Sequence, residues 1–390
     1  MKDPTLYEGR EQTLVKHLIL SRYLERFAII IGFNWTSITY IDCFSGPWKS
    51  RSEQLRDTSF SIALTELRKA REVHLKRSKS IVLRAFFLEK LLSAYSQLKQ
   101  FSNEITDVEI MTHNGELETS VTRILNFIKQ DSKTFPFIFI DPTGWTGFAM
   151  QDIGPLLRLK PGEVLINFIT GHIERFIESP QEQTRESFIR LFGSDQFKPV
   201  LEGLQRKDRE DAIVAEYCET VKRTGRFKHV APAIVLHPQK DRTHFHLIYA
   251  THNDTGLEVF KDAEKRAMTE MEHARAEAQK RRRERKSGQS ELFGSDEMYN
   301  PSYYESIRNR YLSRAKDIIL DRLMTKTRLS YDDAWTLALS QPLTWESDLK
   351  KMIVDWRKEG LAVIGLTDRQ RVPKRDCGHV LVWEAHRNSH

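Results

Sequence analysis

The chain of 390 residues has only three cysteines, and no two of them form a CxxC pair. This scarcity argues against a disulfide framework or a cysteine-based zinc site, and it favours a reducing cytoplasm. No apolar run approaches the length of a membrane span. The N-terminus Met1-Lys-Asp-Pro4 also lacks the apolar core of a signal peptide. We therefore expect a cytoplasmic protein without a membrane partner.

Several catalytic motifs are also missing: there is no Walker loop, no HExxH and no nucleophile elbow. His237, His244 and His246 gather in one predicted hairpin, but a metal site there would need a further ligand such as Asp241. We predict no metal site. The formal net charge of +7 permits a nucleic-acid partner without requiring one.

Apolar runs alternate with amphipathic helices over the first part of the chain. Apolar runs that predict strands occupy 38–42, 81–89, 108–111, 137–140 and 163–168, with helices predicted between them and over 13–31. This alternation predicts an α/β fold with a Rossmann-like, doubly wound parallel sheet. Helices predicted within about 172–226 would form an insertion, and 228–236 with 243–251 would close the sheet as an antiparallel pair.

The rest of the chain divides into a long basic helix and a small domain. We expect a first domain over 1–260, the helix and a linker over 261–300, and a last domain over 301–390. That last domain shows three helices and two strands joined by a basic loop, a winged-helix-like pattern that serves either duplex nucleic acid or protein docking. The basic helix end is either a solvated terminus or an arm that contacts phosphates. The candidate nucleic-acid-binding residues are Arg281, Arg282, Arg283, Arg285, Lys286, Arg369, Arg371, Lys374 and Arg375.

Polar residues follow four of the predicted strands. Asp42 ends the first strand and leads into Phe44-Ser45-Gly46, Glu89 ends the second, Asn114-Gly115 follows the third, and Asp141 ends the fourth. Open α/β sheets bind ligands at this edge. An adenosine-type ligand would use Gly46 for close backbone approach, Glu89 for the ribose hydroxyls and Asn114 for the base edge. Taken singly, each acid fits the end of a strand or the cap of the next helix better than a ligand contact, but the ordered set is more specific than its members.

This ordered set resembles the class I S-adenosylmethionine-dependent methyltransferase fold over about residues 38–170. The resemblance implies S-adenosylmethionine as cofactor. Asp141-Pro142 also resembles the start of the Asp-Pro-Pro-Tyr motif of amino-methylating DNA enzymes, in which oxygens accept from the target amine and an aromatic ring stacks on the flipped base. Here the third residue is Thr143 and the aromatic is Trp145, so the match is partial. We place Asp141, Pro142, Trp145 and Asn167 on the substrate side, and Asp42, Phe44, Ser45, Gly46, Glu89, Asn114 and Gly115 around the cofactor.

Four longer elements carry a second resemblance, which covers nearly the whole chain. They are Lys16-His17-x-Ile19-x-x-x-Tyr23-Leu24, Ile41-Asp42-x-Phe44-x-Gly46-Pro47, Phe139-Ile140-Asp141-Pro142-x-Gly144-Trp145-x-Gly147, and Leu165-Ile166-Asn167-Phe168 with Arg175-Phe176 beyond it. Together they resemble the three-Cys-motif partner protein family (TcmP). Its members are encoded beside a radical-SAM-like protein with a three-cysteine motif. The resemblance implies a methyltransferase-like core, a winged-helix-like C-terminal region and that protein as a partner.

The chain departs from the family pattern in two places. Trp48 stands where the family usually has a second glycine, and Asp57-Thr58-Ser59 stands where it usually has Gly-Ser-Pro. A bulky Trp48 beside the methionine moiety would reshape or block a cofactor pocket.

Three functions remain open from the sequence. The first is a methyltransferase-like protein that acts on or binds nucleic acid or nucleotides, with a radical-SAM-like three-Cys-motif partner. The second is a catalytically degenerate scaffold that binds nucleic acid or protein. The third is a metal-dependent nuclease or toxin-like activity that uses Asp42, Glu89 and Asp141.

Overall fold

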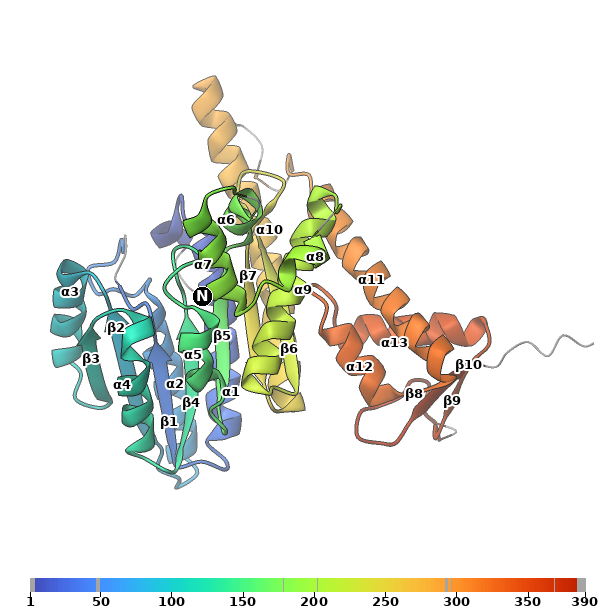
Figure 1. Ribbon diagram of the computed structural model, residues 1–390, viewed down its shortest axis with the longest axis horizontal. Helices are drawn as coiled ribbons and strands as arrows, with labels where there is room; N and C mark the ends of the chain where they lie inside the picture. Colours follow the sequence, from blue (N-terminus) through green and yellow to red (C-terminus); the bar gives the residue numbers. More distant parts are fainter. Residues whose placement is uncertain are drawn as a thin grey trace, which may run out of the picture. The chain divides into compact units, whose positions relative to one another are not determined.

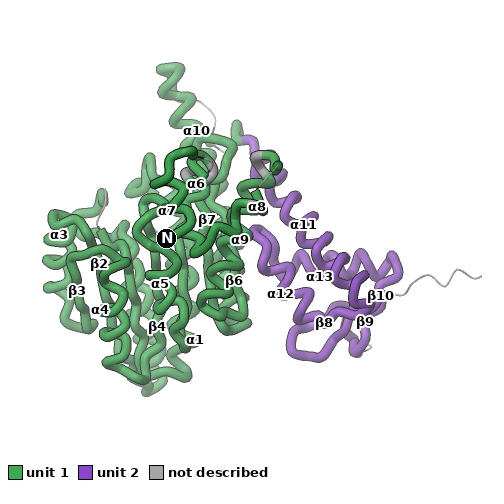
Figure 2. The backbone as a smooth tube through the Cα atoms, in the orientation of Figure 1, with its two compact units in different colours: residues 1–299 green, residues 300–390 purple. Residues whose placement is uncertain are grey.

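The computed structural model describes residues 4–46, 50–177, 179–201, 203–291, 294–295, 297–367 and 369–383. The chain forms two compact units, residues 1–299 and 300–390 (Figure 2). The long basic helix predicted as part of a separate segment belongs to the first unit. Trp48, which was expected to reshape or block a cofactor pocket, lies outside the described residues.

The first unit is built on a seven-stranded sheet in the order β3-β2-β1-β4-β5-β7-β6 (Figure 1). Strands β1 to β5 are parallel, whereas β7 runs antiparallel to both of its neighbours. This confirms the predicted mostly parallel sheet and its closing antiparallel pair. The strand order reverses between β1 and β4, which is the topological switch point of a Rossmann-like sheet. The bounds are β1 Ser37–Asp42, β2 Val82–Glu89, β3 Glu109–Asn114, β4 Thr134–Ile140, β5 Glu163–Phe168, β6 His229–Leu236 and β7 Thr243–Thr251.

Helices cover both faces of this sheet (Figure 1). One face carries α1 (Glu11–Ile31), α2 (Ser59–Leu75) and α10 (Asp254–Ser287), and a short 3-10 helix, η1 (Pro4–Tyr7), precedes α1. The other face carries α4 (Leu117–Lys129), α5 (Met150–Leu157) and α9 (Arg206–Gly225), while α3 (Leu92–Asn103) packs beside β2 and β3. The predicted insertion between β5 and β6 consists of α6 (Thr170–Phe176), α7 (Glu182–Phe192), α8 (Phe197–Leu201) and α9.

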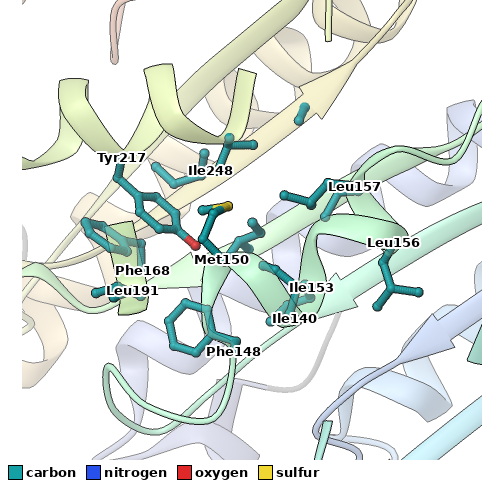
Figure 3. Close-up of a cluster of buried hydrophobic side chains, with 14 of the residues drawn as sticks. Ile140, Phe148, Met150, Ile153, Leu156, Leu157, Phe168, Leu191, Tyr217 and Ile248 are labelled. Carbon is teal, nitrogen blue, oxygen red and sulfur yellow. The ribbon is translucent and has the colours of Figure 1, made fainter. Parts of the chain in front are cut away.

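The sequence folds this way because its strands are buried on both faces. Every residue of β1, β5 and β6 is buried, as a sheet covered by helices on both sides requires. Figure 3 shows the apolar cluster beneath α5, α7 and α9, where the Tyr217 ring stacks on Phe168 with ring centroids 4.1 Å apart. This packing fixes the ends of β4 and β5, from which two of the candidate site residues project.

Within its described residues, the second unit contains three helices and a three-stranded antiparallel sheet in the order β8-β10-β9. The predicted three helices and the paired last strands are confirmed. Strand β8 was not predicted, because three residues carry too little pattern to be recognised. The bounds are α11 Ser302–Lys326, β8 Arg328–Ser330, α12 Tyr331–Leu339, α13 Glu346–Lys358, β9 Leu361–Ile364 and β10 Val380–Trp383.

A glycine in the first turn of α10 provides a test of this packing. A Cβ atom on Gly256 would lie 2.5 Å from the Tyr249 hydroxyl and 2.7 Å from Glu163 Oε1. Gly171, in α6, has no neighbouring atom within 4 Å of the corresponding position. Helix propensity alone predicts that alanine stabilises both sites by up to about 1 kcal/mol. We expect Gly171→Ala to follow this rule and Gly256→Ala to destabilise by about 1–3 kcal/mol, because the new atom displaces buried groups. Urea unfolding of both variants measures the difference, and equal effects would contradict the packing.

Candidate functional site

The sheet brings the predicted strand-end residues to one edge. Asp42, the last residue of β1, pairs with Phe87 of β2 and Phe139 of β4. Glu89 and Asn114 pair with one another across β2 and β3. Asp141 and Asn167 stand at the ends of the next two strands, β4 and β5. The carboxyl edge at the switch point therefore carries the polar groups that the sequence predicted for it.

Asp42 is fully buried and surrounded by neutral donors. Its carboxylate accepts from the Ser59 hydroxyl at 2.6 Å, the Tyr40 hydroxyl at 3.1 Å and the Phe44 N–H at 3.2 Å. Burial, opposed by the Ser59 hydrogen bond and reinforced by the charge of Asp141, raises the pKa of Asp42 from 3.8 to about 6. Asp42 thus ties the end of β1 to the first residue of α2 and shapes the turn that follows it.

The loop between β1 and α2 makes specific contacts through Asp57. Asp57 accepts from the Ser50 hydroxyl at 2.5 Å, the Arg51 N–H at 3.0 Å and the Arg10 guanidinium at 2.6 Å. Burial opposes the charge of Asp57, but these hydrogen bonds lower its pKa below the ordinary value. Asp57 therefore binds the β1–α2 loop to the N-terminal segment through Arg10, while Ser59 binds the start of α2 to Asp42.

The residues predicted around an adenosine ligand are also tied to the backbone. Glu89 is 3% exposed, and its Oε1 accepts from the Leu91 N–H at 2.6 Å. The Asn114 amide group donates to the carbonyl oxygens of Glu89 and Lys90 at 2.8 and 3.0 Å. The Ser45 N–H donates to the Leu88 carbonyl at 2.8 Å, and the Gly115 N–H donates to that of Glu89 at 3.1 Å. Hydrogen bonds to neighbouring backbone groups therefore hold these strand ends together.

Asp141 lies between a cation and an amide. Its Oδ2 is paired with the Lys16 ammonium from α1, and its Oδ1 accepts from Asn167 Nδ2 at 2.7 Å. Asn167 is 4% exposed, and its Oδ1 has no hydrogen-bond partner among the described residues. Lys16 belongs to one of the sequence elements that resemble the TcmP family, but it was not predicted as a site residue. A lone lysine on an amphipathic helix gives no signal that it will meet a strand end 125 positions away.

Trp145, predicted to face the substrate, is held by the helical insertion. Its indole Nε1 donates to the Ser187 hydroxyl at 3.0 Å, and its ring stacks on Phe188 at a centroid distance of 5.5 Å. Phe176 packs on the same ring at 5.3 Å. Pro142, three residues before Trp145, is buried. Trp145 therefore connects the β4–α5 loop to α6 and α7, and any contact with a substrate would be made from this fixed position.

The basic end of α10 is largely engaged with its own unit. Arg281 pairs with Glu11 at 2.5 Å, Arg282 donates to the Gln239 carbonyl at 2.8 Å, and Arg283 pairs with Glu291 at 2.6 Å. Arg285 donates to the Arg281 carbonyl at 3.2 Å, and Lys286 is exposed. Three of the five cations predicted to contact phosphates thus hold the helix to the N-terminal segment, the β6–β7 turn and the segment after α10.

The basic loop of the second unit remains mostly exposed. Arg369, Arg371 and Lys374 are exposed, whereas Arg375 lies over the Trp335 ring at 4.8 Å.

No helix in the described part of the chain is both long enough and apolar enough to cross a membrane. Among the described residues, no three His, Cys, Asp or Glu side chains are grouped so that they could hold a metal ion.

Comparisons with known proteins add a likeness of fold. No family model and no curated protein matches the chain. A Legionella pneumophila (strain Philadelphia 1) protein assigned to DUF519 is similar, with 11% identity, a TM-score of 0.37, and 67% of this chain and 92% of that chain covered. Loganic acid methyltransferase, solved with SAH, is similar with 9% identity, a TM-score of 0.30, and 72% and 91% covered. Because both sequence identities and both TM-scores are low, no activity is transferred from these proteins to this chain. The fold assignment rests on the strand order.

The raised pKa of Asp42 predicts a pH-dependent stability. Between its ordinary pKa of 3.8 and about 6, the folded state binds more protons than the unfolded chain, so rising pH destabilises the fold through this group. The loss reaches about 2–3 kcal/mol by pH 7. Asp42→Asn removes this term, so the free energy of unfolding of the variant relative to the parent should rise by that amount between about pH 4 and 7. Urea unfolding across this range measures it. A difference between the two proteins that does not change with pH would contradict the assignment.

Proposed function

We propose that the first unit binds an adenosine-type ligand, S-adenosylmethionine, at the carboxyl edge of β1, β2 and β4, and transfers its methyl group to an acceptor. The observation that carries the proposal is that Asp42 and Asp141 flank the point where strand order reverses, with Glu89 at the same edge on the neighbouring strand β2. Ligands of open α/β sheets bind in the crevice at this point.

The donor set suits such a ligand. Glu89, fixed by the Leu91 N–H, offers a carboxylate at the end of β2 for the ribose hydroxyls. At the end of β3, a Cβ atom on Gly115 would lie 3.0 Å from His113 Nε2, so a side chain at this position would crowd the His113 ring. Asn114 would act through its Oδ1, because its amide nitrogen is bound to the backbone. Asp42, with three internal donors, would position the Phe44–Gly46 turn.

The acceptor side would be formed by Lys16, Asp141 and Asn167. The bound cofactor would supply an electrophilic methyl group, and the protein would orient the nucleophile. Asn167 Oδ1, buried and without a partner in the described structure, is an acceptor for an N–H group, since such an atom costs about 1–3 kcal/mol when unpaired. Lys16 would hold Asp141 in the orientation that presents this amide.

The resemblance to the TcmP family extends the proposal to partners. We infer a nucleic acid or nucleotide as acceptor and a radical-SAM-like three-Cys-motif protein as partner, because the family elements include the residues that surround Asp141. The second unit would be the winged-helix-like region of that family, and its element order of helix, strand, two helices and two strands supports this. The engagement of Asp42 and Asn114 by internal groups favours the competing function, a scaffold without chemistry.

Calorimetric titration with S-adenosylmethionine tests the cofactor. The parent protein should bind, and Glu89→Ala should weaken binding by about 1–3 kcal/mol through the lost hydrogen bonds. Glu109→Ala is the matched control, because Glu109 begins β3 at the opposite edge, where it pairs with Arg84 and its side chain is 54% exposed. Thermal melts verify that each variant folds. No binding by the folded parent at millimolar ligand would contradict the proposal and favour the scaffold.

Transfer of a labelled methyl group tests the acceptor side. With tritiated S-adenosylmethionine and genomic DNA or total RNA, the parent should incorporate label. Asp141→Asn should abolish incorporation while keeping cofactor affinity within about threefold, since a neutral group no longer pairs with Lys16. Incorporation at the parental rate by Asp141→Asn would exclude Asp141 from the acceptor side.

A further inference from the structure

Helix α13 of the second unit carries a basic face that the sequence did not single out. Lys351, Val354 and Lys358 are spaced three and four residues apart, so they lie on one side of the helix. All three are exposed, Val354 at 38%. A solvent-facing valine between two lysines is an apolar contact point within a cationic stripe.

The same face extends onto α11. Asp355 pairs with Lys358 at 2.9 Å, and its pKa is lowered first by that hydrogen bond and further by Lys351 and Lys316. Lys316 belongs to α11 and is exposed. Three lysines from two helices thus act on Asp355, and with the exposed Glu359 four residues later they still outnumber the acids at this end of α13.

The loop between β9 and β10 is attached to the end of this helix. Arg357, in the last turn of α13, donates from Nη1 to the Arg371 carbonyl at 2.8 Å. This bond brings the exposed cations Arg369, Arg371 and Lys374 next to the stripe. The loop that carries these cations is therefore anchored to the last turn of α13.

Helix α13 is held firmly enough to present this surface. It follows α12 after a turn in which Leu343 adopts a left-handed φ of 53° while its side chain is fully buried. The Trp345 N–H donates to Asp348 Oδ2 at 2.9 Å at the start of the helix. Arg308 of α11 pairs with Asp348 Oδ1 at 2.8 Å. A helix that follows another across a short turn is the arrangement that places a recognition helix in a DNA groove.

We propose that α13 enters the major groove of duplex DNA, with Lys316, Lys351 and Lys358 on phosphates, Val354 toward the base edges, and the β9–β10 loop on the flanking backbone. Thirteen helical residues span about 20 Å, enough to cross a major groove about 12 Å wide. The major groove of duplex RNA is too narrow for a helix, so the partner is DNA. The proposal concerns the second unit and does not depend on cofactor binding by the first.

Fluorescence anisotropy with the full chain and a labelled duplex of about three helical turns tests the surface. We expect the parent to bind, and the double variant Lys351→Glu/Lys358→Glu to lose about tenfold or more in affinity at low salt. The dependence of log K on log salt should become shallower by about 2, one for each lost phosphate contact. The control is Lys76→Glu/Lys99→Glu, which makes the same charge change at two exposed lysines of the first unit and should bind like the parent.

A variant that removes a negative charge gives the opposite sign. Asp355→Asn should tighten DNA binding by about twofold or more, because the acid that neutralises the stripe is gone. Duplex RNA of the same sequence should bind more weakly than DNA. Equal losses in the stripe and control variants, or RNA bound as tightly as DNA, would overturn the proposal. Competition by polyglutamate as effective as that by unlabelled DNA would also overturn it and indicate an acidic protein as partner.

Discussion

Two carboxylates at adjacent strand ends form the constraint around which the first unit is arranged. Asp42 of β1 and Asp141, just after β4, interact across the switch point, and the charge of Asp141 contributes to the raised pKa of Asp42. Two like charges near one another cannot both be ionised without cost. The chain resolves this asymmetrically, with an ammonium on Asp141 and only neutral donors on Asp42. Such a difference between paired acids is common at functional sites.

This asymmetry makes the N-terminal region part of the edge. Lys16 reaches Asp141 from α1, and Arg10, just before that helix, reaches Asp57 in the loop after β1. Glu11, the first residue of α1, forms an ion pair with Arg281 near the C-terminal end of α10. Helix α1 therefore connects the strand ends, the β1–α2 loop and the last turns of α10, and its displacement would alter all three. The carboxyl edge of the sheet is therefore held by ion pairs from distant parts of the first unit and not by one loop alone.

The sequence predicted the parallel sheet and the composition of this edge, because hydrophobic periodicity and strand-end polarity are local signals. It did not predict what each residue contacts. Asn114 was expected to contact a base, yet its amide nitrogen is bound to backbone carbonyls. Trp145 is packed by α6 and α7. Lys16 gave no signal because its partner is distant in the chain. These outcomes depend on tertiary proximity, which no window of the sequence contains.

The basic segments show the same limit most clearly. A run of arginines in a sequence records where the cations are, whereas the acids and carbonyls that engage them come from elsewhere. Arg281 and Arg283 looked like a phosphate-binding arm and instead meet Glu11 and Glu291. Lys316, Lys351 and Lys358 are dispersed in the sequence, yet the fold brings all three within electrostatic reach of Asp355. Because a carboxylate at 2.5–2.6 Å already offsets the charge of each guanidinium, a polyanion gains less from it than from an exposed ammonium. The distribution of neighbouring acids, more than the density of basic residues, therefore decides which surface is available to nucleic acid.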